Sequence, residues 1–250
     1  MRSDIDTQTV MSLLQDLGLH VDAIPEDSEH PTPDLRIACP AGDVLVEVKS
    51  KEDDERLRKF MDSPRGAVHP GPSPSLTSRV REAWHQIRDY PERTDTNFTV
   101  VWFITRKPHT MTVLTHLFIL PIIYGTELLE GRTGADQYYK KPCFFLNPAI
   151  FSRYRELNAV VVHDDQTLQL CLNPLSPRYS IFRNTHLVKA FDTHFAVLDP
   201  PAMEVAGTCF IADPIPSVET TNDAVRRLKA KYNLDTVKIW RIVLYNESVE

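Results

Sequence analysis

The chain has 250 residues, of which 42% are hydrophobic and 25% charged, proportions that match an ordinary soluble globular protein able to bury a sizeable core. Its net charge is −6 and it has no block of lysines or arginines, which excludes a protein that is basic along its whole length. Tight binding to a nucleic acid must therefore come from a local patch, an oligomer or a partner protein. The longest apolar stretch, 117–124, is too short to span a bilayer, so we expect no contact with membranes.

The cysteines and the start of the chain indicate a cellular compartment. The four cysteines are widely scattered and form no Cys-x-x-Cys pair, which argues against a zinc site and against a disulfide framework. Residues 1–6 are polar and acidic, and predict no signal peptide. We therefore expect a cytoplasmic protein with reduced thiols.

The first half of the chain alternates helix and strand signals. Apolar residues one helical turn apart predict a first helix, and short apolar runs between turn residues predict strands. The strongest signal is a hairpin over 33–50, with a Pro-Ala-Gly-Asp turn between its strands. In chain order the expected elements are a helix over 6–17, a strand over 20–23, this hairpin, a helix over 77–90, a strand over 98–104 and a helix over 111–119.

From residue 126 onward the pattern turns mostly to strands. We expect them at 143–146, 159–163, 167–172, 194–198, 208–212 and 237–245, with one amphipathic helix over 218–232. The chain is therefore predicted to hold an α/β core over 1–125 and a strand-rich accessory region over 126–250, which can also pack into the same domain.

The predicted hairpin brings together residues that suit a hard cation and a phosphate. Glu47 and Lys49 are two residues apart on one strand, so their side chains point to the same face, away from a face of valines. If the hairpin closes on its turn, Asp34 lies diagonally across from Glu47. Two carboxylates and an ammonium group at one sheet edge favour phosphodiester chemistry.

This pattern resembles the PD-(D/E)XK phosphodiesterase superfamily, which is the fold of many restriction enzymes, junction resolvases and repair exonucleases. The motif residues are Pro33, Asp34, Glu47, Val48 and Lys49. Downstream, Gln86-Ile-Arg-Asp-Tyr90 is similar to the Q-x-x-x-Y helix motif of the RecB-like branch. The resemblance implies a restriction-endonuclease-like mixed sheet flanked by helices, followed here by a strand-rich C-terminal extension.

The resemblance also implies a metal site. Asp34 and Glu47 would be ligands of Mg²⁺ or Mn²⁺, with the backbone carbonyl of Val48 as a further ligand. Mg²⁺ prefers a few carboxylates plus waters to a full protein cage, which fits such a small set. Lys49 would orient or deprotonate the attacking water and stabilise charge at the phosphate.

Two features of the resemblance concern helices. Gln86 would hydrogen-bond near the metal or the nucleophile, and Tyr90 would contact the DNA backbone or support the site. Many members of the superfamily carry a glutamate on the first helix, and this chain has none before Glu26. Asp6, Gln15 or Asp16 would have to replace it, which leaves the number of metals open.

The sequence thus predicts a metal-dependent endo- or exonuclease of restriction, repair or anti-phage defence type, acting on DNA as a homo-oligomer or beside a DNA-engaging partner such as a helicase-like subunit. Arginines at 79, 81, 88 and 93 are a candidate local patch. The alternative is a catalytically inactive nuclease-fold subunit that serves nucleic-acid binding or complex assembly. A third interpretation is a structural protein whose hairpin carries an ordinary solvated Glu–Lys pair.

Overall fold

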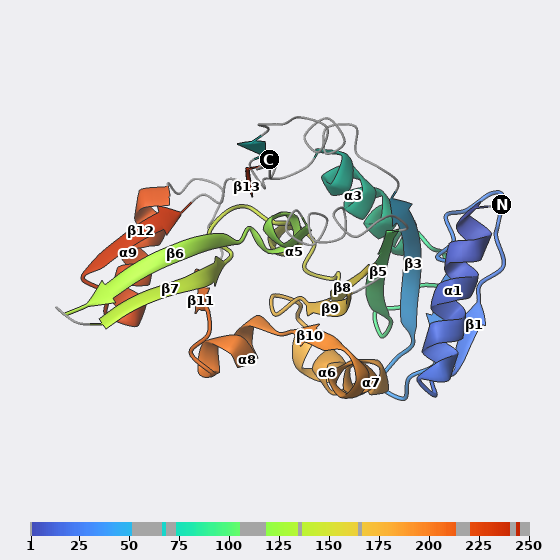
Figure 1. The fold of residues 1–250 in the computed structure, drawn as a ribbon. Helices are drawn as coiled ribbons and strands as arrows, with labels where there is room; N and C mark the ends of the chain where they lie inside the picture. Colours follow the sequence, from blue (N-terminus) through green and yellow to red (C-terminus); the bar gives the residue numbers. More distant parts are fainter. Residues whose placement is uncertain are drawn as a thin grey trace, which may run out of the picture. The chain divides into compact units, whose positions relative to one another are not determined.

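The structure is a computed structural model that describes residues 2–51, 67–68, 74–105, 119–134, 137–164, 167–213, 221–240 and 244–245. The chain forms two compact units, and each unit draws on separate stretches of sequence (Figure 1). Unit 1 comprises 1–52, 74–112 and 154–199, and unit 2 comprises 53–73, 113–153 and 200–250. Within the described ranges, no helix is both long and apolar enough to cross a membrane.

Unit 1 is built on a mixed sheet whose described strands follow the order β1-β2-β3-β5-β8-β9-β10. The first three strands pair antiparallel, whereas β3, β5 and β8 run parallel; β9 is antiparallel to β8, and β10 is parallel to β9. The strands are β1 (Val21–Ala23), β2 (Leu35–Ile37), β3 (Val44–Lys51), β5 (Phe98–Thr105), β8 (Ala159–His163), β9 (Leu168–Leu172) and β10 (Ala196–Leu198).

Helices pack against this sheet, so the prediction of a mixed α/β fold with helices around a large mixed sheet is confirmed at that level. On one face, the valines of β3 join a buried core with Val10 and Leu14 of α1 (Arg2–Asp16). Phe182 of α6 (Tyr179–Arg183) and Phe191 of α7 (His186–His194) belong to the same core. This is the face that the alternation along residues 44–48 predicts to be apolar.

Helix α3 (Pro74–Arg88) packs against β3 and β5 from the other side. Its apolar side chains are buried, and they are Val80, Ala83, Trp84 and Ile87. The helix ends two residues before the end predicted from the sequence, shortly ahead of Pro91, because a proline cannot continue a helical ladder. Gln86 therefore lies in the last turn of α3, and Tyr90 lies beyond it.

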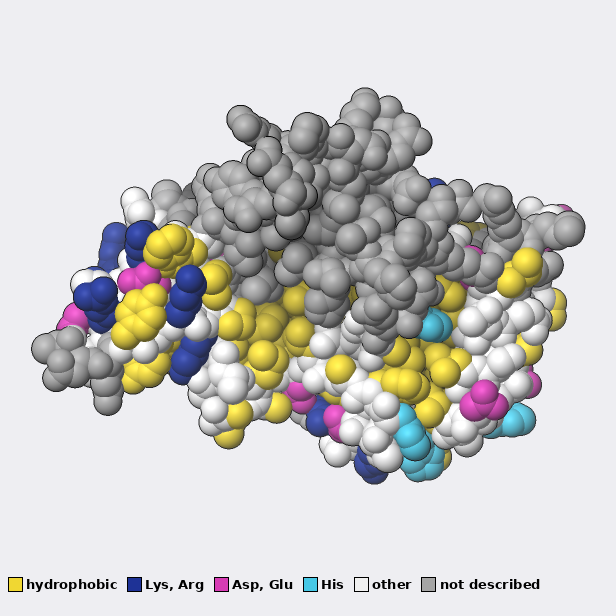
Figure 2. All heavy atoms as spheres, viewed as in Figure 1, with side chains coloured by type: hydrophobic (Ala, Val, Ile, Leu, Met, Phe, Trp, Pro, Cys, Tyr) yellow, Lys and Arg dark blue, Asp and Glu magenta, His cyan; other side chains and the backbone are white. Residues whose placement is uncertain are grey.

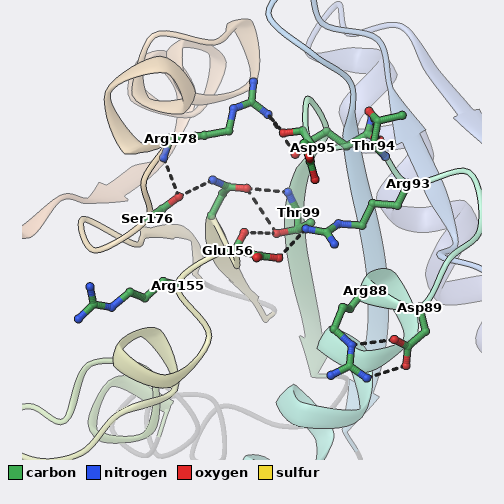
Figure 3. Close-up of polar contacts among 12 residues, drawn as sticks. Arg88, Asp89, Arg93, Thr94, Asp95, Thr99, Arg155, Glu156, Ser176 and Arg178 are labelled. Atoms are coloured by element: carbon green, nitrogen blue, oxygen red, sulfur yellow. Dashed lines mark hydrogen bonds and ion pairs between the residues drawn. The ribbon is translucent and has the colours of Figure 1, made fainter. Parts of the chain in front are cut away.

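The turn between β2 and β3 is fixed by close contacts. Gly42 has φ of 123°, and a Cβ atom there would lie 1.9 Å from the carbonyl oxygen of Thr96, so no other residue fits. Arg178 also holds the turn, since its guanidinium lies 3.9 Å from the Phe98 ring centre and points toward the loop before β5 (Figure 3). It donates hydrogen bonds to the carbonyl oxygens of Ala41 (2.9 Å), Asp95 (3.2 Å), Asn97 (3.1 Å) and Thr96.

Unit 2 has its own sheet, in the order β11-β7-β6-β12 among the described strands. Helix α9 (Thr221–Tyr232) contributes Ala224 and Leu228 to a core that also holds Leu129, Cys143 and Phe210. The strands are β6 (Glu127–Thr133), β7 (Gln137–Phe144), β11 (Phe210–Ile211) and β12 (Thr236–Trp240). The other described elements of unit 2 are β4 (Ala67–Val68), β13 (Leu244–Tyr245), α5 (Ile150–Arg153) and α8 (Pro200–Val205).

Strands from the second half of the sequence belong to both sheets. Residues 159–198, which the sequence analysis grouped with the accessory region, supply β8, β9 and β10 and extend the sheet that contains the motif hairpin. The helix expected over 111–119 lies outside the described residues except for Ile119.

Candidate active site

The hairpin places Asp34 across from Glu47. Leu35 pairs with Val46, so the register continued by one residue sets Asp34 directly opposite Glu47 and not on the diagonal. The Asp34 carboxylate accepts a hydrogen bond from the backbone N–H of Val48 at 2.7 Å. The Asp34 side chain thus takes the hydrogen bond that a backbone carbonyl of β2 would otherwise accept from β3 at this end of the ladder.

Glu47 and Lys49 share the face of β3 that α3 covers. Lys49 Nζ lies 2.5 Å from Glu47 Oε1 and donates a second hydrogen bond to Gln86 Oε1 at 3.2 Å. The amide of Gln86 in turn donates to the carbonyl oxygen of Thr32 at 2.8 Å. Gln86 therefore fixes the lysine and ties α3 to the segment that leads into Asp34.

Burial dominates the electrostatics of the two carboxyl groups. Glu47 is only 1% exposed, and burial together with the nearby Asp34 charge raises its pKa to about 8, although Lys49 opposes the change. Burial also raises the pKa of Asp34, against the Val48 hydrogen bond and the Lys49 charge. Burial and the neighbouring negative charge therefore favour the protonated form of Glu47.

The donor atoms fit a hard divalent cation. Glu47 Oε2 is buried and has no hydrogen-bond partner among the described atoms, so one oxygen of the pair is available. The N–H of Val48 points toward Asp34, and a strand residue directs its N–H and C=O to the same side, so the Val48 carbonyl faces this edge as well. Two carboxylates, one carbonyl and several waters make an Mg²⁺-like set.

The acids at this sheet edge form a small set. Among the residues that the structure describes, no group of three or more His, Cys, Asp or Glu side chains is arranged to hold a metal ion. A cation at this edge would therefore depend on two carboxylates, a backbone carbonyl and water.

The structure places Tyr90 in a neighbouring network and not beside the carboxylates. Its hydroxyl donates to Glu92 Oε2 at 2.7 Å and accepts from Arg36 at 3.3 Å, and Arg36 pairs with Glu92 at 3.0 Å. These three side chains line a cavity of about 480 Å³ together with Thr32 and residues 22–25. The structure thus brings Asp34, Glu47, Lys49 and Gln86 together, whereas Tyr90 bonds to Arg36 and Glu92.

The three α1 residues that could replace the first-helix glutamate differ in their burial. Asp6 is 3% exposed, and the hydroxyl of the next residue, Thr7, reaches Asp34 at 3.5 Å. Gln15 and Asp16 are exposed. Of the three, Asp6 is the acid that α1 carries into the interior on the turn nearest Asp34.

Sequence reasoning missed Arg36 and Glu92. Arg36 alternates with the buried Leu35 and Ile37, a pattern that predicts an outward-facing residue but gives no partner. Two arginines of the candidate patch are paired with acids, as Figure 3 shows: Arg88 with Asp89 at 2.7 Å and Arg93 with Glu156 at 2.7 Å. Arg79 and Arg81 are exposed.

The chain was also compared with known proteins. No protein-family model matches it. No curated protein and no solved structure is significantly similar to it either. The superfamily resemblance therefore rests on the motif residues and their arrangement.

Proposed function

We propose that this protein is a metal-dependent nuclease that hydrolyses phosphodiester bonds in DNA. The observation that carries the proposal is the convergence of Asp34, Glu47 and Lys49 at one sheet edge, with Lys49 bonded to both Glu47 and Gln86. A merely solvated surface pair would not be 1% exposed on its acidic side.

The element order supports a restriction-endonuclease-like core within unit 1. Helix α1, strand β1, the β2–β3 hairpin, helix α3 and strand β5 follow one another, with β3 and β5 parallel and adjacent. This is the layout that the superfamily resemblance implies for residues 1–105. Strands β8 to β10 would then be additions to that core.

In this proposal Asp34, Glu47 and the Val48 carbonyl hold Mg²⁺ or Mn²⁺. The bound ion supplies charge neutralisation at the scissile phosphate and an acidified water. Glu47 would have to be ionised to act as a ligand, so its raised pKa would make cation binding depend on pH.

Lys49 acts beside this pair. Its ammonium group stabilises negative charge on the phosphate and orients the attacking water, while Gln86 keeps the lysine in place. Asp6 is the buried acid on α1 that stands in for the usual first-helix glutamate.

The inactive-subunit alternative has one observation in its favour. Glu47 is almost fully buried, and its pKa near 8 leaves it mostly protonated at neutral pH unless a cation binds. A protein that never bound metal could keep these residues as a hydrogen-bonded structural cluster.

Metal-dependent cleavage separates the two. The purified chain is incubated with supercoiled plasmid and with linear double- and single-stranded DNA, with Mg²⁺, Mn²⁺ or a chelator, alone and with co-purifying proteins. We expect Lys49→Ala to lower the rate by about a thousandfold or more, because transition-state charge loses its partner. The matched control is Lys189→Ala, which removes an exposed lysine of α7 in the same unit. A Lys49→Ala protein that cuts at the wild-type rate assigns the chemistry to other residues, and DNA binding without any cleavage supports the inactive subunit.

A further inference from the structure

Among the described residues, one face of the unit 2 sheet is open. Residues at alternating positions of β6 and β12, such as Leu129, Val237 and Ile239, point into the core on the α9 side. The residues between them point to the opposite face and are exposed or half-buried. Cross-strand pairing makes this second face a continuous surface across β7, β6 and β12.

The open face is basic in an acidic protein. Arg132, Lys140 and Lys238 are exposed there, one from each of the three strands. Glu130 lies between the two lysines in the pairing register and is the acid among these positions. Three cations against one carboxylate contrast with the net charge of −6 for the whole chain.

Two aromatic side chains lie among these cations. Tyr138 is 52% exposed and Trp240 is 37% exposed, which is unusual for large side chains on a strand. The Trp240 ring is oriented by a 2.7 Å hydrogen bond from its Nε1 to Glu130. Figure 2 shows basic and hydrophobic side chains side by side over the part of unit 2 that carries these strands.

The cations are stacked on the rings. Lys238 and Lys140 place their ammonium groups 3.9 Å and 4.9 Å from the Trp240 ring centre, and the Arg132 guanidinium lies 5.7 Å from that of Tyr138. A flat ring and a cation are thus presented together at two places on the face. That pair of groups is what a nucleotide needs, because its base stacks and its phosphate is negative.

We propose that this face binds single-stranded nucleic acid, with bases on Tyr138 and Trp240 and phosphates on Arg132, Lys140 and Lys238. Three strands span roughly 10 Å, room for about two or three nucleotides. A base that stacks on Trp240 would displace a lysine from the ring, and that lysine could then contact the phosphate. Stacking of a base on the ring is a stronger contact than that of an exposed lysine with the ring. Paired bases cannot reach the rings, so the proposal favours single strands. It deepens the proposed nuclease function by giving the substrate a single-stranded part.

Binding is measured without cleavage. The full chain carrying Lys49→Ala is titrated, in chelator, with a fluorescent oligonucleotide of about 12 nucleotides and with the duplex of the same sequence. We expect tighter binding of the single strand. The double variant Tyr138→Ala, Trp240→Ala should weaken single-strand binding about tenfold or more. Replacing Arg132, Lys140 and Lys238 with Gln should lower the slope of log affinity against log salt concentration by about two.

Matched variants control for position. Arg226→Gln removes an exposed cation of α9, and Phe195→Ala removes an exposed aromatic side chain of unit 1; neither should change affinity by more than about twofold. Tyr138→Ser alone, at the more exposed of the two aromatic positions, covers the case in which a double variant does not fold.

Two results overturn the proposal: unchanged single-strand affinity in the folded face variants, or equal or tighter binding of the duplex. Because no metal is present, these results are independent of cleavage. A failure of the nuclease proposal appears instead as wild-type cleavage by Lys49→Ala.

Discussion

The two sheets of this protein use the same alternation of side chains in opposite ways. In unit 1 both faces of β3 are covered, so Glu47 is forced into the interior with Lys49 and Asp34. In unit 2 one face is covered by α9 and the other keeps its charges in solvent. A glutamate beside a lysine is therefore a buried group with a raised pKa in one sheet and part of a polar, partly exposed face in the other.

The sharpest test of this contrast is the pH dependence of stability. The pKa of Glu47 is about 8 in the folded protein against an ordinary value of 4.5, so the folded state holds the proton more tightly. The resulting stabilisation is full below about pH 4.5 and is lost as pH rises toward about 8. We expect Glu47→Gln to become more stable than wild type above about pH 8, by about 2 kcal/mol or more, in urea unfolding across this range.

The control uses the other sheet. Thr236→Ser changes an exposed side chain of β12 that has no titratable group. Its unfolding free energy should follow the wild-type pH curve. A Glu47→Gln curve parallel to wild type would mean that the buried pair does not hold a proton.

A second test asks how far the buried cluster depends on its support. Gln86→Ala removes the hydrogen bonds to Lys49 and to the Thr32 carbonyl. We expect cleavage to fall by about tenfold, which is less than for Lys49→Ala, because the charged groups remain and only their positioning is lost. Gln86→Glu keeps an acceptor for Lys49 and should recover part of the rate. If Gln86→Ala were as slow as Lys49→Ala, Gln86 would instead take part directly in the reaction.

The smallest expected effect is on the open face. Lys238→Gln should change the free energy of unfolding by less than about 0.5 kcal/mol, because an exposed charge contributes little to folding. Thermal unfolding measures this directly. A loss above about 1 kcal/mol would show that the cation over Trp240 is structural and would weaken its assignment to a ligand.

Local patterns predicted the elements that lead to the candidate site. The alternation along 44–49 predicted both faces of β3, and apolar spacing predicted α1 and α3 to within a few residues. Strands β8 and β9 were predicted as well, and the structure pairs them antiparallel. Such predictions succeed where the spacing of apolar residues along one face is enough to identify a helix or a strand.

The misses depend on distant partners. Strand β6 was not predicted, because its charged residues and Gly131 give a weak strand pattern. Its pairing with β7 and with the distant β12 and the close packing of Leu234 against Gly131 became visible only in the structure. Helices α6 and α7 were also missed, although Thr185 caps α7 and Leu187 and Phe191 form its buried side. The position of Tyr90 follows from Pro91 and from Arg36, a contact across 54 residues.

The division of the chain has a consequence for synthesis on the ribosome. The chain leaves unit 1 after Thr112 and returns at Tyr154, and β8 then takes its place beside β5. Until that point the apolar edge of β5 has no neighbour, and exposed edges of this kind invite pairing with other chains. A nascent chain that has already made the Asp34–Glu47 hairpin must therefore wait about fifty residues for its sheet to close. Expression of an N-terminal fragment ending near residue 125 should then yield aggregates and not a smaller folded domain.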